Sequence, residues 1–205
     1  MDLIPGQDDV IALLFRTGAL REGHFKRIDG IHTDQWLETA LALRRYEDAK
    51  LLSVALSRLI RADSTARPAL AELSIVAASV SGIPVAYGVA EALHPKQVYW
   101  VERGHLPQFV EPRRGEKALV VDDVLRSGRS MAETAELLEE RGVEVLGIAA
   151  LFSAPDPTAI SFGRIPVYSL ARLPAARYFP AAECALCRQG VPLQGQERTL
   201  AASFA

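Results

Sequence analysis

Two adjacent carboxylates, Asp122 and Asp123, directly follow the apolar run Ala-Leu-Val-Val at residues 118–121. The run is short and uniformly apolar, as in a strand buried on both faces, so the carboxylates are predicted to lie at a strand end. Residues 124–130 read Val-Leu-Arg-Ser-Gly-Arg-Ser and lead into a helical pattern. Ser130 is predicted to cap that helix, supported by a glutamate three residues later.

This combination of strand, acids, polar loop and helix start suits a sugar phosphate. Backbone N–H groups and the dipole at a helix N-terminus attract a phosphate. Carboxylates repel phosphate, but they accept hydrogen bonds from sugar hydroxyls or hold a hydrated Mg²⁺. A ribose 5-phosphate satisfies both requirements. The alternative interpretation is an ordinary βα turn with solvated acids. The stretch lacks the Gly-Lys-Ser/Thr of a P-loop and the Gly-x-Gly-x-x-Gly of a dinucleotide fold.

Composition limits the class of protein. The chain has 205 residues, of which 49% are hydrophobic, enough for one substantial α/β domain over 1–205. Within it, we expect an N-terminal helix and hairpin in 1–40 and a tail in 180–205. The net charge of −2 provides no basic field for nucleic acid or an anionic membrane, so neither partner is expected. Without a signal-peptide pattern or a membrane-length apolar run, a cytoplasmic location is expected.

Hydrophobic periodicity predicts the elements around the acidic pair. A helix is expected over residues 8–17, and it would pack through Ile11, Leu14 and Phe15. Residues 23–38 are predicted to form two short strands around an Asp-Gly turn. Further helices are predicted over 46–61 and 83–93, and further strands over 73–78, 97–101, 144–152 and 167–170. Alternating strands and helices indicate an α/β fold with a mostly parallel sheet.

The stretch around Asp122 and Asp123 resembles the phosphoribosyl pyrophosphate (PRPP) motif of the type I phosphoribosyltransferases, in which two acids precede a Thr/Ser-Gly-x-Thr/Ser loop. The resemblance implies that family's fold, a central, mostly parallel sheet flanked by helices with a small N-terminal hairpin hood. It also implies that the acids contact ribose hydroxyls and that Mg²⁺ accompanies PRPP. The implied PRPP-binding loop consists of Val124, Leu125, Arg126, Ser127, Gly128, Arg129 and Ser130.

Two other segments resemble orotate phosphoribosyltransferases specifically. Residues 13–38 are similar to the start of those enzymes, and Lys26 matches a position that reaches toward substrate; an exposed strand lysine is the alternative. The strand ending in Glu102 and Arg103 matches the Glu-Arg-Lys of the family, which implies a catalytic and PRPP-binding Arg103. In the family a mobile loop then closes over PRPP in the neighbouring subunit, so the resemblance implies a homodimer.

Three positions depart from the family pattern. The pyrophosphate loop corresponds to Ser79, Val80, Ser81 and Gly82 and keeps one glycine, although glycine allows a backbone to approach a diphosphate closely. Gly104 replaces the lysine, which leaves His105, Arg113 and Arg114 as the cations of the loop; the two arginines are interpreted as a solvated turn. Ser153 stands where the family has an arginine that meets the orotate carboxylate. Arg126 is predicted either to bind the base in its place or to plug the base pocket.

The tail carries Cys184 and Cys187 in a Cys-x-x-Cys pattern, which can be half a zinc site, a redox pair or two ordinary thiols. Similar tails occur in some orotate phosphoribosyltransferase-like proteins. All four histidines lie far upstream in sequence, so the cysteine pair is expected to have no partner within one chain, and dimerisation is one way to supply a second pair if zinc is bound. Zinc therefore stays one of three alternatives.

The expected function is transfer of ribose 5-phosphate from PRPP to a nitrogenous base, with loss of pyrophosphate. The resemblance makes orotate the expected base and pyrimidine nucleotide biosynthesis the expected pathway. Two alternatives stay open: a phosphoribosyltransferase for another base, and a PRPP- or nucleotide-binding regulatory protein that has lost turnover.

Overall fold

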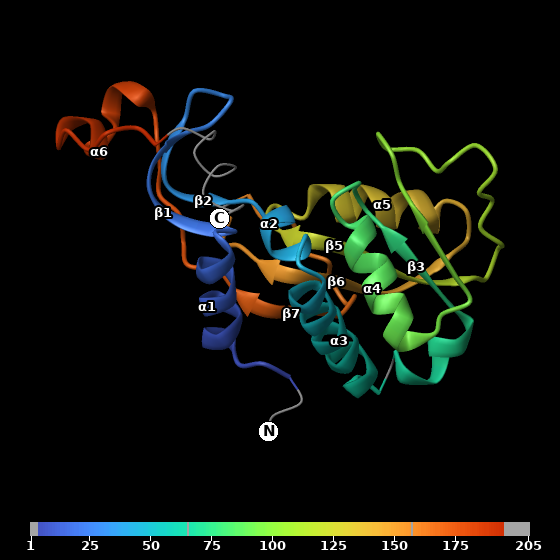
Figure 1. The fold of residues 1–205 in the computed structure, drawn as a ribbon. Coiled ribbons are helices and arrows are strands. Elements are labelled where there is room, and N and C mark those ends of the chain that lie inside the picture. Colours follow the sequence, from blue (N-terminus) through green and yellow to red (C-terminus); the bar gives the residue numbers. More distant parts are fainter. Residues whose placement is uncertain (1–3, 65, 157, 195–205) are drawn as a thin grey trace.

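A computed structural model describes residues 4–64, 66–156 and 158–194. Its centre is a five-stranded parallel sheet in the order β4-β3-β5-β6-β7 (Figure 1). The strands are β3 (Leu73–Ala77), β4 (Gln97–Trp100), β5 (Lys117–Leu125), β6 (Glu144–Ser153) and β7 (Val167–Arg172). All five residues of β3 are buried, as an apolar strand covered on both faces requires. The predicted α/β class and parallel sheet are confirmed.

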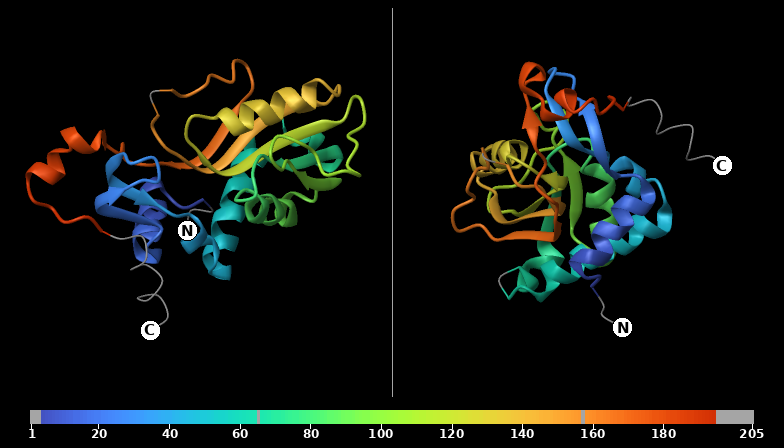
Figure 2. Two further views of the ribbon diagram at one scale, coloured as in Figure 1. Left: turned by 90° about the horizontal axis from the view of Figure 1, so that it is seen from above. Right: turned by 90° about the vertical axis from the view of Figure 1, so that its left-hand side faces the viewer.

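Helices cover both faces of the sheet. On one face lie α1 (Gln7–Thr17), α3 (Tyr46–Ala62) and α4 (Ile83–Leu93), and on the other lies α5 (Arg129–Glu139) (Figure 2). Each face has its own apolar core, and Met131, Ala135 and Leu138 of α5 belong to the second. Among the described helices, none combines the length and apolar character needed to cross a bilayer.

The buried face of α1 differs from the prediction. Val10, Leu13, Leu14 and Thr17 are buried, whereas Phe15 is 42% exposed. These buried positions follow the i, i+3, i+4, i+7 spacing of one helix face, and Phe15 lies beside that face. The expectation that Phe15 packs inward was wrong.

A small antiparallel sheet forms a hood beyond the carboxyl ends of the parallel strands (Figure 1). Its strands are β1 (Leu20–Lys26), β2 (His32–Leu37) and β8 (Tyr178–Phe179), in the order β1-β2-β8. The turn between β1 and β2 contains Gly30 at φ 82°, so the predicted hairpin is confirmed. Strand β8 was not predicted, because two residues carry no periodicity. It joins the C-terminal tail to the N-terminal hairpin.

Candidate functional site

The acidic pair lies where β5 loses one of its two neighbours. Strand β3 ends at Ala77, opposite Val121, and the following residue donates the last inter-strand hydrogen bond, from Ala78 N to Val121 O at 2.9 Å. Strand β5 was expected to end at the acids, but it continues to Leu125 because β6 still pairs with it. The chain continues from β3 to β4 on one side and from β5 to β6 on the other, so the pair lies at a topological switch point, where open α/β sheets bind ligands.

Hydroxyl groups from two other segments hold these carboxylates. The Ser79 hydroxyl donates to Asp122 Oδ1 at 2.7 Å, and the Ser81 hydroxyl donates to Asp123 Oδ1 at 3.2 Å. Thr39, which precedes the short helix α2 (Ala40–Leu43), donates to Asp123 Oδ2. Asp122 and Asp123 are only 6% and 8% exposed. The carboxylates are therefore anchored by donors of the kind that sugar hydroxyls would also supply.

The surroundings of Asp122 shift its pKa. Burial raises the pKa of the Asp122 carboxyl to about 7, and repulsion from Asp123 adds to the rise, while the hydrogen bond from Ser79 opposes it. Asp122 can therefore exchange a proton near neutral pH as a ligand arrives.

The pair opens into a cavity of about 650 Å³, which we call the acid cavity. Its wall comes from four segments: the hood with α2, the loop after β3 with the start of α4, the end of β5 with the loop after it, and the start of α5. The lining residues are Leu37, Glu38, Thr39, Ala40, Leu43, Arg44, Ser79, Ser81, Pro84, Asp122, Asp123, Val124, Arg126 and Ser130. Thr39 and Arg44 were not predicted, because no motif marks this connection between hairpin and helix.

The loop after the acids leads directly into α5. Gly128 adopts φ 77° as the residue before the helix, and helix α5 begins at Arg129. Ser130 was predicted to be the N-cap, but it lies inside the first turn because glycine enters the left-handed conformation without a Cβ penalty. The segment after β6 holds this loop through two backbone hydrogen bonds of 2.8 Å, from Ala154 N to Leu125 O and from Ile160 N to Ser127 O. The structure thus offers a helix N-terminus beside the acid cavity.

Arg103 lies in a tight turn on the other side of the loop after β3. Arg103 and Gly104 have φ values of 52° and 80°, and Glu102 and His105 exchange backbone hydrogen bonds of 2.8 and 3.0 Å, as in a type I′ turn. Arg103 is exposed and lines a neighbouring cavity that shares Ser79 with the acid cavity. The glycine in place of the family's lysine therefore fits the backbone conformation.

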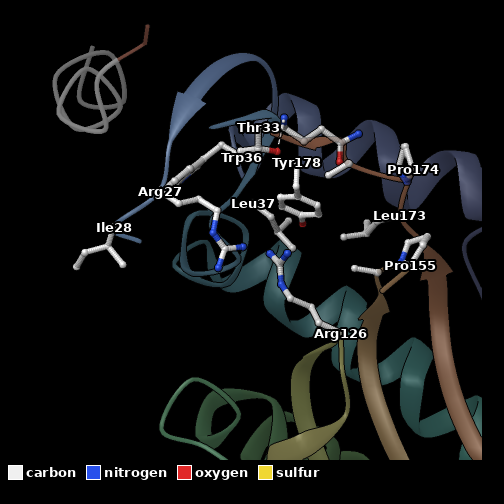
Figure 3. Close-up of a pocket in the computed structure, with 13 residues that line it drawn as sticks. Arg27, Ile28, Thr33, Trp36, Leu37, Arg126, Pro155, Leu173, Pro174 and Tyr178 are labelled. Carbon is white, nitrogen blue, oxygen red and sulfur yellow. Dashed lines mark hydrogen bonds between the residues drawn. The ribbon is translucent and has the colours of Figure 1, made fainter. Parts of the chain in front are cut away.

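A second cavity of about 470 Å³ lies under the hood, and we call it the hood cavity. Arg126 and Leu37 line both it and the acid cavity. Figure 3 shows the guanidinium groups of Arg27 and Arg126 pointing into the same space, with the ring of Tyr178 beside them. Arg27, Trp36 and Tyr178 were not predicted, because a hairpin turn, β2 and β8 bring them together only in the fold.

Other predicted residues line neither cavity. Lys26 ends β1 as an exposed side chain and lines neither cavity. Arg113 and Arg114 precede β5. That strand advances about 17 Å from Lys117 to Asp122, so the two arginines lie far from the acids. Ser153 ends β6 beside Leu125. Cys184 and Cys187 lie against His24 and His32 of the same chain, so the expectation that the cysteine pair has no partner within one chain was wrong.

Comparison with known families agrees with this geometry. A family model described as the phosphoribosyl transferase domain matches residues 63–161, which include both acids and the loop after them. The orotate phosphoribosyltransferase of Carboxydothermus hydrogenoformans is 32% identical over 90% of this chain and 94% of its own length. An orotate phosphoribosyltransferase of Thermus thermophilus is 30% identical over 91% of this chain and 98% of its own length.

Solved structures share the fold. The orotate phosphoribosyltransferase of Aeropyrum pernix superposes with a TM-score of 0.63 at 22% identity, over 80% of this chain and 93% of that chain. The orotate phosphoribosyltransferase of Mycobacterium tuberculosis in complex with inorganic phosphate gives a TM-score of 0.65 at 21% identity, over 82% and 95%.

Proposed function

Because the chain belongs to the orotate phosphoribosyltransferase family, we propose that it joins orotate to C1 of the ribose 5-phosphate of PRPP. The bond between C1 and the pyrophosphate oxygen breaks, a carbon–nitrogen bond forms, and pyrophosphate leaves. The product is orotidine 5′-phosphate, a precursor of pyrimidine nucleotides. The observation that carries the proposal is that the acid cavity and the hood cavity adjoin and share Arg126.

The acid cavity is assigned to PRPP. Asp122 and Asp123 would accept hydrogen bonds from the ribose hydroxyls, and the loop of residues 124–130 would hold the 5-phosphate at the start of α5. Ser79 to Gly82 would face the pyrophosphate, with Arg103 beside them. The carboxylates would stabilise the positive charge that develops on the ribose as pyrophosphate leaves.

The hood cavity is assigned to the base. Arg27 and Arg126 provide two guanidinium groups, which can each bind a carboxylate through parallel hydrogen bonds. Trp36 and Tyr178 provide aromatic surface for a planar ring. These two arginines would take the place of the arginine that the family has where this chain has Ser153. Orotate, a planar ring with one carboxylate, matches both features.

Magnesium fits the acid cavity as a companion of PRPP. Mg²⁺ is usually held by one or two carboxylates together with substrate phosphates and water, and Asp122 and Asp123 supply the carboxylates. When bound, the ion neutralises the charge on the diphosphate. The protein's own groups orient the ribose and exclude water.

We also propose that the protein is a homodimer, and the loop before β5 supports this. Arg113 and Arg114, at the end of their loop, lie toward the amino end of β5 and away from the acids of their own chain, while Phe109 earlier in the loop is 90% exposed. The resemblance to orotate phosphoribosyltransferases implies that this loop serves the neighbouring subunit, and the exposed ring of Phe109 is available for such a contact. Light scattering at micromolar concentration tests the dimer, and a monomer would refute it.

We also propose a single catalytic domain over residues 1–205 and a cytoplasmic location.

Pyrophosphate release from PRPP and Mg²⁺, measured across a panel of purine and pyrimidine bases, tests the function. Pyrophosphate release with orotate, and with no other base of the panel, supports the proposal. Release only with another base points to a different phosphoribosyltransferase, for which the serine at position 153 is the favouring observation. PRPP binding without release for any base points to a regulatory protein, which the Gly104 turn favours.

A further inference from the structure

Two histidines of the hood and two cysteines of the tail converge on one point. His24 lies in β1, His32 begins β2, and Cys184 and Cys187 flank the start of the short helix α6 (Ala185–Arg188). One nitrogen or sulfur atom from each residue lies within 4.8 Å of all the others. The side chains belong to segments about 160 positions apart, since His24 and Cys184 differ by 160 in number.

Hydrogen bonding alone does not account for this convergence. His24 Nε2 lies 2.9 Å from His32 Nδ1, 3.4 Å from Cys184 Sγ and 3.7 Å from Cys187 Sγ. His24 Nδ1 lies 2.7 Å from Val191 O, a carbonyl that can only accept, so Nδ1 carries the proton. Nε2 is then left with one lone pair, which cannot accept three hydrogen bonds. A cation at the centre would satisfy all the groups at once.

The spacing matches a tetrahedral zinc ion. With zinc–nitrogen bonds of about 2.05 Å and zinc–sulfur bonds of about 2.3 Å, a tetrahedron separates two nitrogens by about 3.4 Å and a nitrogen from a sulfur by about 3.6 Å. The observed nitrogen–sulfur distances, including 3.3 Å from Cys187 Sγ to His32 Nδ1, lie close to the second value. The two nitrogens, at 2.9 Å, need to move apart by a few tenths of an ångström.

The surroundings are those of a structural metal site. His24, His32 and Cys184 are at most 5% exposed, and both cysteines are free thiols. The bond between His24 Nδ1 and Val191 O orients the ring, as outer-shell carbonyls do for metal-binding histidines. An irregularity in β1 between Glu22 and Phe25 allows His24 and Phe25 to be buried in succession.

We propose that His24 Nε2, His32 Nδ1, Cys184 Sγ and Cys187 Sγ bind one structural zinc ion within a single chain. Two thiolates and two imidazoles favour zinc over magnesium or calcium, which prefer oxygen ligands. The ion would tie the tail to the hairpin one residue away from Thr33, which lines the hood cavity. It would therefore stabilise the hood over the base site without touching substrate. The proposal does not depend on the identity of the base.

Metal analysis of the full chain tests this site. The protein is purified without a polyhistidine tag, under reducing conditions, and dialysed free of loose metal. We expect about one zinc per chain in the wild type and less than about a tenth in Cys184→Ser with Cys187→Ser or in His24→Asn with His32→Asn. His94→Asn is the matched control, because His94 is exposed at the end of α4 in a left-handed conformation that asparagine tolerates. It should keep full zinc content.

Cobalt substitution keeps the test decisive if a double variant does not fold. Co²⁺ added to metal-free wild type should give the visible bands of a tetrahedral site and a thiolate charge-transfer band. The single change Cys187→Ser, at an exposed position, should weaken the charge-transfer band. Wild type that carries no zinc, takes up none after reduction and shows no cobalt spectrum would overturn the proposal. A disulfide between the two cysteines in freshly purified protein would also overturn it.

Discussion

Gly82 packs so closely against Asp122 that a Cβ atom on the glycine would lie 2.7 Å from Asp122 Oδ1 and 3.0 Å from Asp122 Cα. The φ angle of Gly82 is −77°, which any residue can adopt, so close approach rather than backbone conformation requires a glycine here. Gly82, the one glycine in the loop after β3, therefore leaves the space that Asp122 occupies.

Gly82→Ala should displace Asp122 and weaken PRPP binding. Overpacking of this kind costs about 1–3 kcal/mol, which corresponds to roughly a 5- to 150-fold loss of affinity if it falls on the bound state. Calorimetric titration with PRPP and Mg²⁺ measures it. Gly6→Ala before α1 is the matched control: Gly6 also has a negative φ, −64°, an added Cβ would meet only Asp9 Oδ2 at an ordinary 3.4 Å, and the variant should bind as wild type does. Equal affinity in Gly82→Ala and wild type would show that Asp122 does not position PRPP.

The raised pKa of Asp122 predicts pH-dependent PRPP binding. Burial keeps the carboxyl protonated up to about pH 7, whereas a ribose hydroxyl donates best to the ionised form. Affinity should fall as the pH drops from 8 toward 6, and binding near pH 7 should release a proton. Titration in buffers of different ionisation enthalpy detects that proton. Asp122→Asn should remove the release, and release that persists in this variant would contradict the assignment.

The same pKa predicts a stability change with a definite sign. Between the unfolded pKa of about 3.9 and the folded value of about 7, the folded chain binds more protons than the unfolded chain. The contribution of Asp122 to the free energy of unfolding should therefore fall as the pH rises through this range and stay low above it. Comparing urea unfolding of wild type and Asp122→Asn at pH 5 and pH 8 measures it. The variant should gain stability relative to wild type at pH 8, and a relative loss would contradict the sign.

Arg27 and Arg126 should bind the base together. Each of Arg27→Ala and Arg126→Ala should weaken orotate binding by about 1.5–3 kcal/mol, the range for hydrogen bonds to charged groups. Arg27 lines the hood cavity and not the acid cavity, so Arg27→Ala should leave PRPP affinity nearly unchanged. Arg164→Ala, at an exposed position, is the control. If Arg126 instead plugs the hood cavity, Arg126→Ala should create or improve base binding. Unchanged orotate affinity in both variants would place the carboxylate elsewhere.

Gly104 should resist replacement by the lysine found in the family. At φ 80° a residue with a Cβ atom is strained, so Gly104→Lys should lower stability by about 1–2 kcal/mol, although no atom lies within 4 Å of the added Cβ. Gly104→Asn, which tolerates this conformation better, should lose less. Thermal unfolding compares the three proteins. A fully stable Gly104→Lys variant would show that the turn readily changes shape.

The sequence was sufficient to predict the parallel sheet, the hairpin and the acidic pair, because each has a local pattern. It did not reveal Thr39, which reaches Asp123 from 84 positions away, or the pairing of Tyr178 with Thr33. Contacts of this kind depend on how the hood folds over the sheet. The four metal-ligand candidates were all visible as residue types, but only β8 and the turn into α6 bring the cysteines to the histidines.

Formation of orotidine 5′-phosphate with equimolar pyrophosphate, from PRPP, Mg²⁺ and orotate, tests the central claim most directly. The wild type should form both products. Asp122→Asn with Asp123→Asn should reduce the rate by at least about 100-fold, as expected for loss of electrostatic stabilisation of the reacting sugar. Asp8→Asn with Asp9→Asn, the same change on the exposed first turn of α1, should retain the wild-type rate. Absence of both products from folded wild-type protein that binds PRPP, or an undiminished rate in the Asp122 and Asp123 double variant, would contradict the account.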